Sequence, residues 1–324
     1  MEYTQNAINV LAARTFKGIG RAWFVKNWQP NFTDVSSVVT LINQSRKNET
    51  PISIADFEHK REIIVDSLMK SQDCMDGVVA IGDTKFPSHR GDVKNSEQPI
   101  FLFYKGDLSL LSTVSRNVAV IGLLTPTPSI EERERMVVEA LVQRGATIVS
   151  GLALGCDAIA HRTTLECGGK TIAILPSPLN SIMPASNRPL AQTILEHDGL
   201  LITEYLSPAK SKMALSSRYQ ERDRLQALFS DGIVLSASYA KNNMGYDSGS
   251  RLAMGYASDY GIPRAVIYDQ SEDINPIFDL NRQYMREDSK LVVISKDDLQ
   301  SSLDVLFSLK PKRSTSVQTQ RKMF

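Results

Sequence analysis

From residue 117 onward, short apolar runs alternate with longer segments of helical character. Uninterrupted apolar runs of four or five residues are typical of strands buried on both faces of a sheet. Strands that alternate with helices of about 10–15 residues indicate βαβ units, for which right-handed crossovers are the default. The sequence therefore predicts an α/β fold with a doubly wound, mostly parallel sheet. Its strands are expected at residues 118–121, 147–150, 171–175, 200–204, 232–235, 264–268 and 291–294.

The most regular helix in this part is expected to begin at Ser129, where Glu132 three residues later would complete a capping box. Residues 77–81 and 100–104 are apolar runs as well, and they predict two further strands ahead of the alternating part.

The first 75 residues show helical periodicity instead, with Ile8, Leu11 and Ala12 at a spacing of three to four. Gly18 and Gly20 then flank Ile19 between two apolar helical stretches. This turn is either a hairpin whose backbone N–H groups hold a DNA phosphate, or a plain turn between two packed helices. Three residues are a weak signal, so they favour the plain turn.

The chain is therefore expected to divide into a helical module at 1–75, an α/β domain at 76–309 and a tail at 310–324. The tail has five cations and no acid, and it is expected to be disordered.

Composition excludes several classes of protein. The 37 Lys and Arg residues balance 36 Asp and Glu, so a basic coat like that of a histone is excluded, although a local basic patch is not. We see no apolar run of the about 18 residues that a membrane-spanning helix needs, and no signal peptide at the N-terminus. The 3 cysteines form no CxxC pair, which argues against a disulfide framework and against a cysteine-rich metal site. This cysteine usage predicts that the protein is located in the reducing cytoplasm. Neither GxGxxG nor GxxxxGK[ST] occurs, which disfavours an ordinary NAD enzyme or NTPase.

In doubly wound sheets, ligands bind at the carboxyl ends of the strands, where loops lead into helix N-termini that attract anions. The loop after the first parallel strand contains Gly122 and Thr125, and the segment after the second runs from Ser150 through Arg162. Asp157 and His161 share one face of a helix there. Taken alone, such a pair is more often a capping Asp beside a surface His than part of a phosphate-binding loop.

The later loops add cations and hydroxyls. The segment 216–224 mixes arginines with Tyr219 and acids, so it fits single-stranded nucleic acid and a solvated helix face equally well. The complete set of candidate phosphate-binding residues is Gly122, Thr125, Ser150, Gly151, Gly155, Asp157, His161, Arg162, Arg188, Arg222, Arg224, Lys241, Ser248, Gly249, Ser250 and Arg251.

The order of motifs over residues 76–269 resembles the DprA/Smf family of DNA-processing proteins. The segment 150–161 is similar to the family's S-G-x-A-x-G-x-D-x-x-A-H motif almost position for position. Glu204-Tyr205, Arg222-Asp223-Arg224 and Ser248-Gly249-Ser250 follow in the expected places.

This resemblance implies an extended Rossmann-like domain that binds single-stranded DNA, loads a RecA-type recombinase and usually forms a homodimer. It also implies a binding protein rather than an enzyme. We expect no cofactor, no metal and no membrane partner. The helical module is similar to the small N-terminal module, of the SAM or helix-hairpin-helix type, that many members carry.

The chain also departs from the family pattern. The usual G-S-R of the first loop is Gly122-Leu123-Leu124, the Asn of R-N-R is Asp223, and a Glu expected near the end of the fifth strand is Ser236. About five extra residues, around 242–247, precede Ser248.

Two alternatives therefore stay open: a nucleotide-binding sensor, and a partner-binding protein of a mobile-element or phage-defence system. Nucleotide hydrolysis is disfavoured because the loop at 247–251 lacks the catalytic Glu of related hydrolases.

Overall fold

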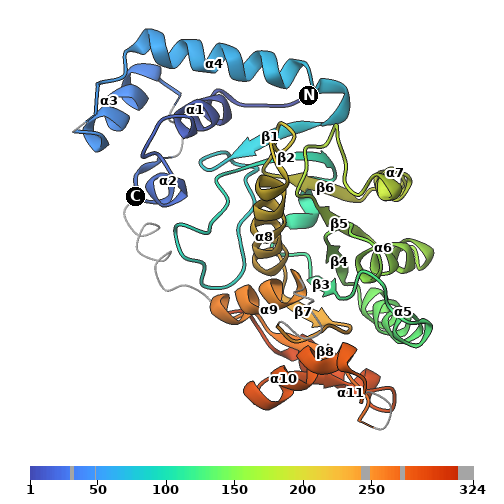
Figure 1. The fold of residues 1–324 in the computed structure, drawn as a ribbon. Helices are drawn as coiled ribbons and strands as arrows, with labels where there is room; N and C mark the ends of the chain where they lie inside the picture. Colours follow the sequence, from blue (N-terminus) through green and yellow to red (C-terminus); the bar gives the residue numbers. More distant parts are fainter. Residues whose placement is uncertain (30–32, 48, 242–248, 271–273, 313–324) are drawn as a thin grey trace.

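The computed structural model describes residues 1–29, 33–47, 49–241, 249–270 and 274–312. Within these ranges, nine strands form one sheet in the order β1-β2-β6-β5-β4-β3-β7-β8-β9 (Figure 1). The strands are β1 (Gly77–Ala80), β2 (Phe101–Gly106), β3 (Asn117–Ile121), β4 (Thr147–Ser150), β5 (Thr171–Ile174), β6 (Leu200–Thr203), β7 (Gly232–Leu235), β8 (Arg264–Ile267) and β9 (Val292–Ile294).

The sheet is parallel from β6 to β9, whereas β2 runs antiparallel to both β1 and β6. From β3 the chain adds β4, β5 and β6 on one side, then returns to add β7, β8 and β9 on the other. This reversal confirms the predicted doubly wound α/β fold. It places the usual ligand crevice at the carboxyl ends of β3 and its neighbours β4 and β7.

Helices cover both faces of this sheet (Figure 1). The helices are α1 (Gln5–Arg14), α2 (Arg21–Asn27), α3 (Val35–Ser45), α4 (Ile54–Met69), α5 (Pro128–Gln143), α6 (Cys156–Glu166), α7 (Arg188–Glu196), α8 (Lys212–Leu228), α9 (Gly249–Tyr260), α10 (Asp279–Glu287) and α11 (Leu299–Ser308). Short 3-10 helices occupy Gln72–Cys74, Leu108–Leu111, Ala185–Asn187 and Pro276–Phe278. None of the helices in the described part of the chain is both long and apolar enough to cross a membrane.

Helix α5 begins earlier than the sequence predicts. Its N-cap is Thr127, whose hydroxyl accepts a bond from the Ile130 N–H at 3.4 Å, and Pro128 is its first residue. The expected capping box of Ser129 and Glu132 is therefore wrong. Proline at the first helical position fixes a helical φ and lacks an N–H, so the helix starts there and Ser129 lies inside its first turn.

Two hydrophobic clusters hold the parallel part of the sheet. One face packs against α5 and α11, through side chains such as Val138 and Leu303. The other face packs against α8, α9 and α10, through side chains such as Leu225 and Met254. A long connection between β1 and β2 joins this second layer, where Gly91 lies against the end of α9 with a φ of +74°.

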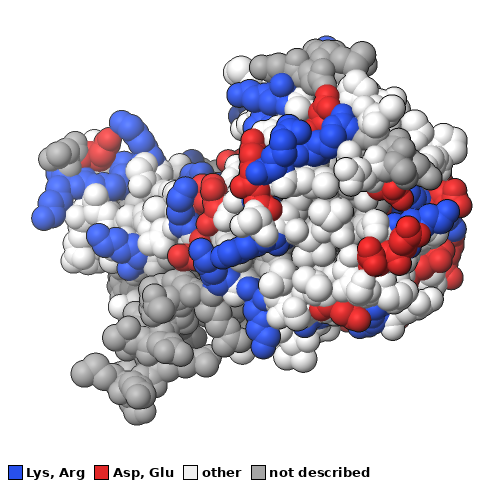
Figure 2. Space-filling model, turned by 90° about the horizontal axis from the view of Figure 1, so that it is seen from below, with Lys and Arg blue, Asp and Glu red and all other residues white. Residues whose placement is uncertain are grey.

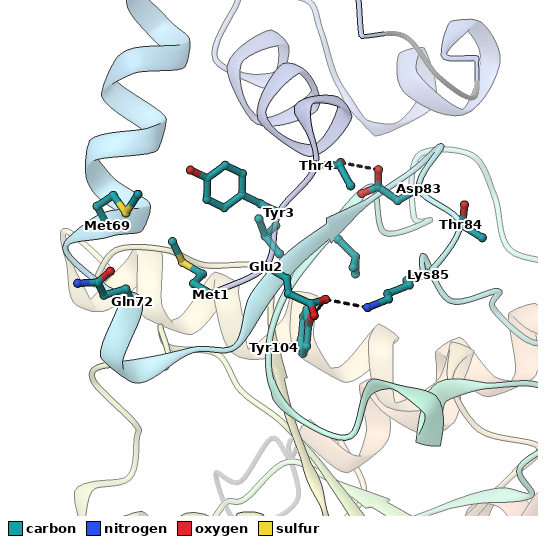
Figure 3. A pocket seen from close by; sticks show the side chains of 12 residues that line it. Met1, Glu2, Tyr3, Thr4, Met69, Gln72, Asp83, Thr84, Lys85 and Tyr104 are labelled. Atoms are coloured by element: carbon teal, nitrogen blue, oxygen red, sulfur yellow. Dashed lines mark hydrogen bonds and ion pairs between the residues drawn. The ribbon is translucent and has the colours of Figure 1, made fainter.

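The N-terminal helices pack over the β1–β2 end of the sheet (Figure 1) and share a third hydrophobic cluster with it. The outer edge of β1 is closed by the chain itself. The N–H of Glu2 donates to the Asp76 carbonyl at 2.6 Å, the Val78 N–H donates to the Glu2 carbonyl at 3.0 Å, and the Ala80 N–H donates to the Asp83 carboxylate at 2.8 Å. Figure 3 shows how the Glu2–Lys85 and Thr4–Asp83 contacts cross this edge beside a cavity of about 660 Å³. Such cover protects an edge strand from unwanted pairing.

Candidate nucleic-acid interface

Three loops and two helix N-termini meet at the carboxyl ends of β3, β4 and β7. The Cys156 N–H, in the first turn of α6, donates to the Leu123 carbonyl at 2.9 Å. The Ser250 hydroxyl, in the first turn of α9, donates to the Gly122 carbonyl at 3.1 Å. A Cβ at Gly122 would lie 2.6 Å from the Cys156 sulfur and 3.2 Å from the Ser236 Cβ, so glycine allows the loop to approach α6 and the end of β7 closely. The loop after β3 thus carries the N-termini of α6 and α9 on either side.

The loop after β4 is shaped by two further glycines. Gly155 caps α6 with a φ of +68°, and a Cβ there would overlap the Leu123 carbonyl oxygen. A Cβ at Gly151 would overlap the guanidinium of Arg222. Gly155 therefore requires glycine because of its backbone conformation and its contact with backbone atoms, whereas a side chain at Gly151 would displace the buried guanidinium of Arg222.

Asp157 organises this loop from within. Its carboxylate accepts bonds from the backbone N–H groups of Gly151 at 3.1 Å and Ala153 at 3.2 Å. It also lies 3.5 Å from Nη1 of Arg222, and the side chains of both residues are more than nine-tenths buried. The negative charge is thus paired and buried rather than turned toward a ligand.

His161 is fully buried one turn further along α6. Its Nδ1 lies 2.7 Å from the Thr171 hydroxyl, which itself donates to the Ile148 carbonyl at 2.8 Å. Because that hydroxyl proton is already used, Nδ1 is the donor and Nε2 is left unprotonated. Burial lowers the pKa of His161 to about 3, so the ring is neutral at physiological pH. The imidazole therefore supports the loop from below and does not contact a ligand at the surface.

Arg224 is buried in a charge network. Its Nη2 lies 2.7 Å from both carboxylate oxygens of Glu204. Arg21 of α2 reaches the same Glu204 at 3.1 Å and also Glu221 of α8 at 2.7 Å. The network therefore joins the N-terminal helices to the carboxyl end of β6 and to α8, and Arg224 presents no group to the surface.

Asp223 lies between these two arginines in the sequence and is buried too. It accepts a bond from Gln226 at 3.1 Å and stands 3.6 Å from Arg222. Burial raises the pKa of Asp223 to about 7, against the opposite effect of Arg222, so its charge is only partly developed at neutral pH.

The remaining candidates differ in exposure. Ser150 is buried, and its hydroxyl donates to the Val120 carbonyl at 2.7 Å. This hydrogen bond links β4 to β3. Arg251 is half-buried in the first turn of α9, where its carbonyl accepts a bond from the Tyr284 hydroxyl. The exposed candidates are Thr125, Arg162, Arg188 and Lys241. Ser248 and residues 242–247 lie outside the described residues, as does the tail from 313.

Gly18 and Gly20 separate α1 from α2, remote in sequence from these loops. Gly18 has a φ of +86° and Gly20 caps α2. The next residue, Arg21, is the one that reaches Glu204, so this turn is held against the α/β part through its neighbour.

Sequence reasoning missed a buried acid beneath the site. Glu134 on α5 is completely buried beside Cys156 and Ser236, and neither of its carboxylate oxygens has a hydrogen-bond partner of good geometry. Burial raises the pKa of Glu134 to about 8. The signal was present in the sequence, because Glu134 shares the helix face of Ile130, Val137 and Val138.

The arrangement suits anion binding. The dipoles of α6 and α9 place positive potential at this edge. Exposed cations stand on α6 (Arg162), on α7 (Arg188) and in the loop after β7 (Lys241). Figure 2 shows the molecule from below, where groups of Lys and Arg side chains lie among Asp and Glu.

Within the described ranges, no cluster of three or more His, Cys, Asp or Glu side chains has the geometry of a metal site. Burial also raises the pKa of the Cys156 thiol well above its usual value, so this cysteine is not an activated nucleophile.

A doubly wound sheet with glycine-lined loops and two helix N-termini at its carboxyl edge defines a Rossmann-like α/β protein. Comparison with known proteins makes this class specific. The family model for DNA recombination-mediator protein A matches residues 77–297, and the chain belongs to that family.

Curated relatives include Protein Smf of Synechocystis, 34% identical over 164 residues, which are 50% of this chain and 39% of the relative. DNA processing protein DprA of Streptococcus pneumoniae is 30% identical over 203 residues, or 63% of this chain and 67% of the relative. The chain thus spans about two fifths of the Synechocystis protein that it matches.

Two solved structures share the fold. DNA processing protein A from Streptococcus pneumoniae superposes with a TM-score of 0.70 at 23% identity, covering 96% of this chain and 100% of that one. The Helicobacter pylori protein superposes with a TM-score of 0.55 at 26% identity, covering 71% of this chain and 96% of that one. The latter structure was described for its single-stranded DNA binding mode.

Proposed function

We propose that this chain binds single-stranded DNA along the carboxyl edge of its sheet and acts as a recombination mediator that loads a RecA-type recombinase. One observation carries the binding proposal: the N-termini of α6 and α9 meet on the loop after β3, through Cys156 to Leu123 and Ser250 to Gly122. The single-stranded DNA binding described for the Helicobacter pylori relative supports it. The homodimer and the cytoplasmic location expected from the sequence are part of the same proposal.

The charges at this edge favour a polyanion. Two acids beside the loops are both buried: Asp157 is paired with Arg222, and Asp223 has a pKa raised by burial to about 7. The cations Arg162, Arg188 and Lys241 are exposed. A phosphate that approaches the loops therefore meets helix N-termini and solvated cations, while the carboxylates stay withdrawn.

The test is fluorescence anisotropy of the full chain with a labelled oligonucleotide of a few tens of nucleotides, at several salt concentrations. We expect binding that weakens with salt by about 0.7 log units of affinity per log unit of salt for each phosphate contacted. Unlabelled single strand should compete better than duplex or mononucleotides. No binding at low salt would overturn the proposal, and displacement by a mononucleotide would turn it toward a nucleotide sensor.

Recombinase loading needs a second measurement. Adding the chain to a RecA-type recombinase and single-stranded DNA should shorten the lag before filament growth. Sedimentation equilibrium of the chain alone tests the homodimer. If the chain binds single-stranded DNA but leaves the lag unchanged, the proposed loading of the recombinase is overturned and the proposed DNA binding stands.

A further inference from the structure

A pocket lies at the carboxyl edge of the sheet, where β5 and β6 end. It has a volume of about 250 Å³ and is enclosed by the loops after these two strands and by the first two turns of α8. Pro178, Met183 and Pro208 contribute apolar walls, whereas Ser181, Lys212 and Arg218 contribute polar groups. We call this the β5–β6 pocket. Among the described residues, no Asp or Glu lines it.

Arg218 is held in place at the wall of this pocket. Its Nη1 donates to the Ser207 carbonyl at 2.7 Å, and its guanidinium lies over the ring of Tyr205, 4.1 Å from the ring centre. The bond to Ser207 uses one of the five N–H donors of a guanidinium. The cation is therefore oriented before any ligand arrives, which lowers the entropy that binding would cost.

Elements that line the β5–β6 pocket also contact the loops described above. Arg218 and Arg222 are four residues apart on α8, so they share one helix face, and Arg222 reaches Gly151 in the loop after β4. The Asn187 side-chain amide donates to the carbonyls of Leu152 at 3.0 Å and Ala153 at 2.9 Å, which ties the loop after β5 to the loop after β4. A ligand that runs along this edge would therefore pass from one site to the other.

The chemistry of the pocket fits one nucleotide of a single strand. Apolar walls suit the faces of a heterocyclic base, and cations at the rim suit its phosphate. The volume equals that of about eight water molecules at roughly 30 Å³ each, which leaves room for a base but not for a duplex.

We propose that the β5–β6 pocket binds one nucleobase of single-stranded DNA, while Lys212 and Arg218 pair with an adjoining phosphate. This inference rests on the proposed function and adds to it a site that tells a base-bearing strand from a bare sugar–phosphate chain.

The experiment compares two labelled strands of equal length and charge, one of oligothymidylate and one in which every base is replaced by an abasic analogue. The full chain should bind the thymidylate strand about 5- to 150-fold more tightly, the range expected for stacking of one base. Ser181→Trp, which fills the pocket, should remove most of this preference and leave the affinity for the abasic strand unchanged. Ala209→Trp fills the pocket from the loop after β6 and should act in the same way, so the test survives if one variant fails to fold.

Lys212→Gln separates the phosphate contact from the base contact. It should weaken both strands equally and reduce the salt slope by about 0.7, the value for one phosphate. Lys290→Gln is the matched control, because Lys290 is exposed before β9, at the opposite edge of the sheet, and carries the same charge. It should change neither affinity nor slope.

The outcomes separate the two proposals. Tight binding of thymidylate by wild type and by both tryptophan variants would overturn the pocket proposal and leave the proposed function intact. Equal binding of the thymidylate and abasic strands by wild type would overturn the pocket proposal as well. Failure of wild type to bind either strand at low salt would overturn the proposed function itself.

Discussion

Charged side chains at the carboxyl edge fall into two groups by exposure. Arg222, Asp223 and Arg224 are buried on α8, where they pair with one another or with neighbours on other elements. Arg162 and Lys241 are exposed. The buried group fixes the geometry of the loops, and the proposed function assigns phosphate neutralisation to the exposed group.

Arg224→Ala should therefore act on stability first. It leaves Glu204 buried without its closest partner, and removing one member of a buried ion pair typically costs about 3–5 kcal/mol. Urea denaturation should show a loss of this size in the free energy of unfolding. Arg162→Ala, at an exposed position, should change it by no more than about 0.5 kcal/mol and instead weaken DNA binding. A loss below about 1 kcal/mol for Arg224→Ala would contradict the buried network.

Glu134 gives the molecule a distinct pH dependence. In the folded chain its pKa is raised by burial to about 8, whereas 4.5 is the ordinary value of a glutamate. Between these two values the unfolded chain loses the proton and the folded chain keeps it. The contribution of Glu134 to stability therefore falls as pH rises from about 4.5 to 8, by up to about 1.4 kcal/mol per pH unit, and levels off above.

Glu134→Gln removes this titration and keeps the shape of the side chain. The variant should gain stability over wild type steadily as pH rises toward 8, although Cys156, Ser236, Asp157 and Glu131 also face this carboxyl group and modify its pKa. Chemical denaturation of both proteins at several pH values between 5 and 9 measures the difference. A constant difference across this range would show that Glu134 does not carry the proton.

At the scale of elements, hydrophobic pattern predicted the strands better than the helix ends. Strands β3 to β9 are mostly apolar, and each lies within one residue of its predicted position at either end. The start of α5 was missed because Ser129 and Glu132 match a capping box in sequence, whereas Thr127 with Pro128 makes the actual cap. The order of strands in the sheet depends on long-range packing, which no local pattern contains.

The sequence likewise predicted some features of the candidate site and not others. Its place at the carboxyl edge follows from βαβ topology, which the sequence predicts. The burial of His161 and Arg224 does not follow, because each depends on partners distant in sequence, Thr171 in one case and Glu204 in the other. Ser236 and Glu134 lie 102 residues apart in the sequence, so a departure from the family pattern at Ser236 gave no hint that a carboxyl group stands beside it.

Gly155 offers a test of the loop as an element. Gly155→Ala places a Cβ at a φ of +68° and against the Leu123 carbonyl, whereas Gly145→Ala meets a φ of +76° with nothing within 4 Å. Both variants should lose about 1 kcal/mol from the backbone conformation alone. Gly155→Ala should lose at least about 1 kcal/mol more, because the loops after β3 and β4 must separate, and its DNA affinity should fall. Thermal unfolding measures the difference, and equal losses for the two variants would contradict the close contact between these loops.

At the scale of the whole molecule, the N-terminal helices and the sheet are joined at two places. Side chains of α1 and α3 share a hydrophobic cluster with residues of β1 and β2. Arg21 adds a charged link to Glu204 and Glu221. The helical module at 1–75 and the α/β domain are thus connected by a hydrophobic contact and a charge network. An interface of this kind couples the stabilities of the two parts.

The two tryptophans of the chain make this coupling measurable. Both Trp23 and Trp28 lie among the N-terminal helices, so tryptophan fluorescence reports on that part alone, whereas circular dichroism reports on all eleven described helices. In wild type, the two signals should follow one urea transition, as expected for a single cooperative unit. Arg21→Ala should move the fluorescence midpoint below the dichroism midpoint, because the hydrophobic contact then holds the N-terminal helices without the charged link. Lys26→Ala, on the same helix, is the control and should leave the two midpoints together. If wild type already unfolds in two steps, the helical module is an independent unit and the network does not hold it to the sheet.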